Sequence, residues 1–142
     1  MTTKLNPYLS FHGAAREAIG FYHDVFGGDL RTTTYAEGGM SSEPGAAELI
    51  MHSQLDAPNG MTLMASDSPP GMPARDGSAI SISLSGEDDA ELTRYWEGLS
   101  AGGTVTMPFE TAPWGDKFGI LSDRYGITWF VNITKVPAGT SA

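Results

Sequence analysis

The chain has 142 residues, of which 40% are apolar and 18% charged, as expected for one globular domain with its own core. Eight Lys and Arg against 17 Asp and Glu give a net charge of −9, which disfavours nucleic acid and anionic membrane surfaces as partners. The absence of cysteine excludes disulfides, thiolate metal sites and cysteine nucleophiles. With no apolar run of signal-peptide or membrane-span length, we expect a soluble cytoplasmic protein.

The first half of the chain predicts one strand, one helix and three further strands. Residues 6–13 (NPYLSFHG) are typical of a strand, and residues 14–28 carry apolar side chains at helical spacing before Gly27-Gly28 ends the helix. Residues 29–36, 46–56 and 60–67 are typical of strands. Asn59-Gly60 predicts a hairpin between the last two.

The second half repeats this order. Residues 68–77 (SPPGMPARDG) predict a linker, because Pro and Gly interrupt regular structure. A strand over 78–86, a helix over 87–103 that ends at Gly102-Gly103, and strands over 104–110, 117–123 and 127–135 follow. The βαβββ order therefore occurs twice, and each helix ends in a Gly-Gly pair. This predicts two helix-covered sheets, each with a second face that is buried or lines a cavity.

His52 is the histidine whose pattern best fits a functional role. Strict alternation along 46–56 places Ile50, His52 and Gln54 on one face, while the more apolar face packs under the helices. A histidine that faces a cavity could act as a general base near neutral pH or contact a ligand. It could equally be a hydrogen-bonded sheet histidine without a catalytic role.

The aromatic residues near the C-terminus give further candidates. Trp114 precedes Gly115 in a loop, where an indole could stack on a ligand or fill a gap at a subunit interface. Trp129 and Phe130 are neighbours in a strand, so one belongs to the core and the other to the opposite face.

Several segments in this order resemble the PhnB-like branch of the vicinal oxygen chelate superfamily, which also contains glyoxalase I, bleomycin-resistance proteins and extradiol dioxygenases. They are NPYLSFHGAAREAIGFYHDVFGG, IMHSQLD, LMASD and PWGDKFGILSDRYGITWFVN. The resemblance runs from about Asn6 to Asn132. It implies an α+β fold of two βαβββ modules, about 5–67 and 78–135, whose curved mixed sheets form a cup. It also implies a homodimer.

Members of the superfamily that perform chemistry hold a divalent metal with His and Glu ligands. The resemblance places Asn6, then Ser66 or Asp67, then Ser78 or Ala79, and finally Phe130 at the four ligand positions. Asp67 is the one strong ligand in this set, and tight Zn²⁺ or Ni²⁺ binding needs three or four converging donors. A metal cofactor is therefore disfavoured, with Asp67 as a weak candidate.

The leading hypothesis is a protein that binds a small organic molecule. The residues expected to contact it are Tyr8, Ser10, Ile50, His52, Met64, Trp114, Trp129 and Phe130. The alternative is an enzyme, either a metal-dependent lyase, transferase or dioxygenase-like protein or an acid–base catalyst that uses His52. Some relatives carry a ubiquinone-methyltransferase label, but no glycine-rich cofactor-binding turn is present. A third possibility is a cup filled by side chains.

Overall fold

The computed structural model describes residues 5–39, 45–68 and 80–135. The chain divides into two compact units, Met1–Asp76 and Gly77–Ala142. The division falls within the predicted linker, most of which lies outside the described residues. No helix in the described part of the chain is long and apolar enough to cross a membrane.

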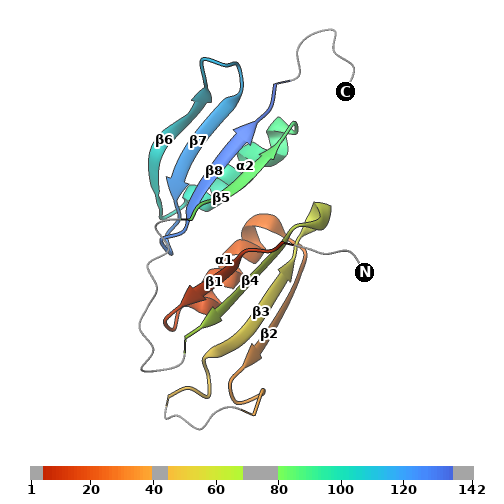
Figure 1. Cartoon of the computed structure of the whole chain (residues 1–142), viewed down its shortest axis with the longest axis vertical. Helices are drawn as coiled ribbons and strands as arrows, with labels where there is room; N and C mark the ends of the chain where they lie inside the picture. The colour runs from red at the N-terminus through yellow and green to blue at the C-terminus, as the bar shows by residue number, and fades with distance from the viewer. Residues whose placement is uncertain (1–4, 40–44, 69–79, 136–142) are drawn as a thin grey trace. The chain divides into compact units, whose positions relative to one another are not determined.

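The first unit is a four-stranded mixed sheet with one helix (Figure 1). Its elements are β1 (Tyr8–Phe11), α1 (Ala15–Phe26), β2 (Asp29–Thr34), β3 (Ile50–Asp56), a 3₁₀ turn (Pro58–Gly60) and β4 (Thr62–Asp67). The strand order is β1-β4-β3-β2, in which β1 and β4 are parallel and the other pairs antiparallel. Helix α1 packs on one face of this sheet, against β2, β3 and β4.

The second unit has the same topology. Its elements are β5 (Ile82–Gly86), α2 (Asp89–Ser100), β6 (Thr104–Thr111), β7 (Lys117–Ser122) and β8 (Thr128–Ile133). The order is β5-β8-β7-β6, again with the first pair parallel and the others antiparallel. The predicted repeat and the α+β class are thus confirmed, and each sheet is open rather than closed.

Each helix buries the stripe that its sequence predicts. Five residues of α1 are buried: Ala15, Ala18, Ile19, Tyr22 and Phe26. In α2, Leu92, Tyr95 and Leu99 are buried. Trp96 is half-buried, and its indole stacks on Phe109 of β6 with ring centroids 4.8 Å apart.

The two Gly-Gly pairs have a steric cause. A Cβ on Gly28 would collide with the backbone of Asp56 and Ala57, where β3 ends, and a Cβ on Gly103 would collide with Ser122 and Asp123, where β7 ends. The second glycine of each pair therefore lets the chain leaving the helix pass close to a strand end. The repeat in sequence reflects a repeated close approach of backbones.

Candidate functional site

The face of the first sheet away from α1 is largely polar. Tyr8 and Ser10 of β1 are exposed there, and they lie in register with Met64 and Ser66 of β4. Gln54 of β3 is paired with Met64. The predicted contact residues Tyr8, Ser10, His52 and Met64 are thus brought onto one surface, which we call the first open face.

Tyr8 and His52 are in direct contact on the first open face. The Tyr8 hydroxyl lies 3.2 Å from His52 Nδ1, and the ring centroids are 5.8 Å apart. The hydroxyl donates when Nδ1 carries no proton and accepts when it does. In either state Nε2 remains for a ligand, so the pair can hold or transfer a proton at that atom.

The prediction that Ile50 shares this face with His52 is wrong. The pairing of β2 with β3 shifts between Thr33, which is opposite His52, and Thr34, which is opposite Ile50. This β-bulge adds a residue to β3 and reverses the alternation before it. Ile50 is consequently fully buried in the core beneath the sheet, with no surface that a ligand on the first open face could touch.

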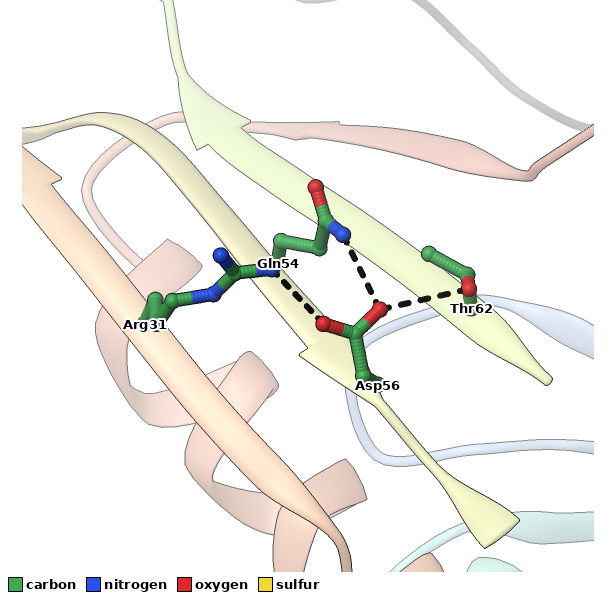
Figure 2. Close-up of polar contacts among 4 residues, drawn as sticks. All are labelled: Arg31, Gln54, Asp56 and Thr62. Atoms are coloured by element: carbon green, nitrogen blue, oxygen red, sulfur yellow. Dashed lines mark hydrogen bonds and ion pairs between the residues drawn. The ribbon is translucent and has the colours of Figure 1, made fainter. Parts of the chain in front are cut away.

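Figure 2 shows a second polar cluster in this sheet, centred on Asp56. Arg31 forms an ion pair with its Oδ2 at 2.7 Å. Gln54 Nε2 donates to Oδ1 at 2.9 Å, and Thr62 Oγ1 lies 3.4 Å from the same oxygen. The hydrogen bond from Gln54 is the chief reason that the pKa of the Asp56 carboxyl lies below its ordinary value, and the charge of Arg31 adds to it.

Removing that hydrogen bond should raise the pKa of Asp56. We expect Gln54→Leu to move it toward the ordinary carboxyl value, and Thr62→Val to move it less. Because the folded pKa is depressed, the stabilisation is present at neutral pH and is lost as the pH falls through the folded pKa. A carbon-13 NMR titration of the carboxyl group measures this directly, and an unchanged pKa in Gln54→Leu would contradict it.

The carboxylate of Asp67, the weak metal candidate, accepts hydrogen bonds from backbone N–H groups. It is buried, and its Oδ1 accepts hydrogen bonds from the N–H groups of Gly13 (2.7 Å) and Ala15 (3.0 Å). Its Oδ2 accepts one from the N–H of Ile50 at 3.0 Å. These donors surround the carboxylate, and two of them belong to the start of α1, where the N-cap residue Ala14 has no capping side chain. The structure therefore gives Asp67 a structural role.

At the other metal-ligand positions that the family resemblance implies, the side chains are weak metal ligands or cannot bind a metal at all. Asn6 and Ser66 are half-buried, and Phe130 has no donor atom. Ser78 and Ala79 lie outside the described residues. Across residues 5–39, 45–68 and 80–135, no three His, Asp or Glu side chains come together as a metal site would require.

The corresponding face of the second sheet is aromatic. Phe118 of β7 and Phe130 of β8 meet edge to face with ring centroids 5.8 Å apart, and the indole of Trp114 lies 6.0 Å from Phe118. Trp114 is 65% exposed, in the β6–β7 loop that turns at Gly115 with φ 103°. Ile120 is paired with Phe130 on the same surface. We call this surface, formed by Trp114, Phe118, Ile120 and Phe130, the aromatic face.

Trp129 lies on the opposite side of the sheet from Phe130, as alternation requires. It is almost completely buried, and its Nε1–H donates to Asp123 Oδ2 at 2.8 Å. Asp123 Oδ1 also accepts from the N–H groups of Tyr125 and Ile127. The prediction that Trp129 contacts a ligand is therefore wrong, because Trp129 belongs to the core, while Phe130 belongs to the aromatic face.

Ile120 and Phe118 of the aromatic face were not among the contact residues predicted from the sequence. Phe118 is the residue whose ring adjoins Trp114. Alternation in KFGILS places Phe118 on the other face of the sheet from the buried Gly119 and Leu121, and therefore on the same face as Ile120. Its contact with Trp114 needed the structure, since the course of the intervening loop decides it.

The fold matches solved structures of one class. Protein PA1353 from Pseudomonas aeruginosa is 35% identical, with 95% of this chain and 100% of that chain covered and a TM-score of 0.82. A glyoxylase/bleomycin resistance protein/dioxygenase domain from Frankia sp. EAN1pec shares the fold at 14% identity, with a TM-score of 0.64 over 99% of this chain and 96% of that chain. The chain thus has the glyoxalase/bleomycin-resistance fold.

A narrower family also matches. The family model described as 3-demethylubiquinone-9 3-methyltransferase covers residues 3–132. A putative 3-demethylubiquinone-9 3-methyltransferase, PhnB protein, from Bacillus cereus is 27% identical, with 93% of this chain and 100% of that chain covered and a TM-score of 0.75. The chain belongs to this PhnB-like family.

Proposed function

We propose that this protein binds a small organic molecule through the aromatic face of its second unit. The observation that carries the proposal is Trp114, a large side chain that remains 65% exposed while it adjoins Phe118. An exposed indole beside further aromatic rings offers a flat apolar surface on which a planar ligand can stack. Ligand sites typically combine such apolar surface with a few polar groups.

Nile red, a neutral dye that fluoresces in apolar surroundings, tests the proposal. We expect the wild-type protein to bind it and Trp114→Ser to bind it about tenfold more weakly, because the stacking surface is lost. The control is Val105→Ser, which removes another exposed apolar side chain: Val105 is paired with the buried Leu121, on the side of the sheet that α2 covers. Equal affinities of wild type and Trp114→Ser in a fluorescence titration would refute the proposal.

The contact between Tyr8 and His52 favours a second candidate, an acid–base enzyme that uses His52. Once an organic ligand of the protein has been identified, the His52→Ala variant distinguishes a binding protein from an acid–base enzyme. A ligand that the wild type converts and that the variant binds without conversion would assign the chemistry to His52. A ligand recovered unchanged from both proteins would leave binding as the function.

A further inference from the structure

Two carboxylates border the aromatic face. Glu110 of β6 is the cross-strand partner of Phe118, and its side chain is exposed. Directly opposed residues of an antiparallel pair project to the same face with Cβ atoms about 5 Å apart, so Glu110 lies beside the Phe118 ring. Asp116 stands in the loop that carries Trp114, and its Oδ2 accepts a hydrogen bond from Asn132 Nδ2 at 3.2 Å. Asn132 is the other cross-strand partner of Phe118.

These carboxylates have no cationic partner among the described residues. The groups that contact Asp116 are neutral: the amide of Asn132 and the backbone N–H of Lys135, 3.2 Å from Oδ1. Asp116 and Glu110 therefore leave the aromatic face with negative charge.

The nearest lysine in sequence is turned to the other side of the sheet. Lys117 alternates with Phe118, and its Nζ lies over the ring of Phe109, 4.6 Å from the centroid. Phe109 in turn stacks on Trp96 of α2. This cation–π contact holds the ammonium on the helix-covered side, away from the two carboxylates.

We infer that the ligand of the aromatic face is an organic cation with a planar apolar body. The inference rests on the proposed function and adds the charge of the ligand. The negative faces of the indole and phenyl rings attract a cation, and Glu110 and Asp116 reinforce that attraction. An anionic ligand of the same shape would meet repulsion from both.

Three probes of nearly equal size and shape separate charge from hydrophobicity. They are N-methylquinolinium (a permanent cation), 1-methylnaphthalene (neutral) and 1-naphthoate (an anion). Binding is followed through the indole N–H resonance of Trp114 in nitrogen-15 NMR spectra. This resonance is assigned as the peak that the spectrum of the Trp114→Phe variant lacks. The resonance of Trp96, on the helix-covered side, serves as an internal reference.

We expect N-methylquinolinium to bind at least about fivefold more tightly than 1-methylnaphthalene, and 1-naphthoate to bind most weakly. The preference for the cation should shrink as salt is added, because exposed charges are screened. Glu110→Gln should weaken the cation about threefold and leave the neutral probe unchanged. Glu97→Gln is the matched control, since Glu97 is exposed on α2 and its loss changes the net charge equally.

The possible results are distinguishable. Equal binding of the cation and the neutral probe would overturn the charge preference and leave the proposed function standing. No binding of any probe would refute both for this face. A Trp114 resonance that moves with protein concentration rather than with probe would show that a second copy of the chain covers the face, which would also overturn the inference.

Discussion

Asp67→Ala is expected to destabilise the protein by about 3–5 kcal/mol. The substitution leaves the N–H groups of Gly13, Ala15 and Ile50 without their acceptor. An unsatisfied buried donor costs about 1–3 kcal/mol, and partial entry of water keeps the total below the simple sum. The start of α1 also loses the negative charge that its helix dipole favours.

Asp88→Ala provides the matched control, because Asp88 caps α2 in the ordinary local way. Its carboxylate accepts a hydrogen bond from the N–H of Glu91 at 3.1 Å on the surface, and losing such a cap costs about 1 kcal/mol. Urea unfolding followed by circular dichroism compares the two variants. The three tryptophans, Trp96, Trp114 and Trp129, all lie in the second unit, so their fluorescence follows that unit separately. If Asp67→Ala costs no more than Asp88→Ala, the proposed role of Asp67 fails.

Gly28→Ala is expected to cost about 3–5 kcal/mol, while Gly27→Ala costs about 1–2 kcal/mol. Both glycines have positive φ, 95° and 76°, so both substitutions strain the backbone. They differ in space: a Cβ on Gly27 meets nothing within 4 Å, whereas one on Gly28 meets the carbonyl oxygen of Asp56 and, at 2.8 Å, the Cα of Ala57. Backbone atoms at a strand end cannot rotate away as a side chain would.

The same denaturation experiment measures this pair of variants. A soluble Gly27→Ala protein beside a Gly28→Ala protein that fails to fold would be the extreme form of the expected result. Equal stability of the two would mean that β3 and the chain leaving α1 can separate at little cost, and the steric account of the Gly-Gly pair would be wrong.

Local pattern was enough to predict most of the fold. The apolar spacing in α1 and α2, the Asn59-Gly60 turn and the alternation in β7 and β8 are each set by neighbours along the chain. Alternation also predicted that Trp129 and Phe130 separate into core and surface, although it could not say which belongs where. Their burial follows from the position of α2, which packs against β8 on the side of Trp129.

The bulge at Thr33 and Thr34 shows where such reasoning fails. A strand read in isolation alternates without interruption, whereas the inserted residue exists only relative to the partner strand. The shift moved Ile50 into the core and left His52 on the first open face. No property of the segment AAELIMHSQLD by itself indicates it.

The sequence by itself determined the repeated βαβββ order and the two helix-covered sheets, because these depend on periodicity within short segments. Only the tertiary structure decided the partners of isolated polar and aromatic groups. Asp67 accepts a hydrogen bond from the N–H of Ala15, 52 residues earlier in the chain. The Tyr8 hydroxyl contacts His52, 44 residues later. Contacts between residues so far apart in the chain are fixed by strand pairing and packing, which spacing along the sequence does not encode.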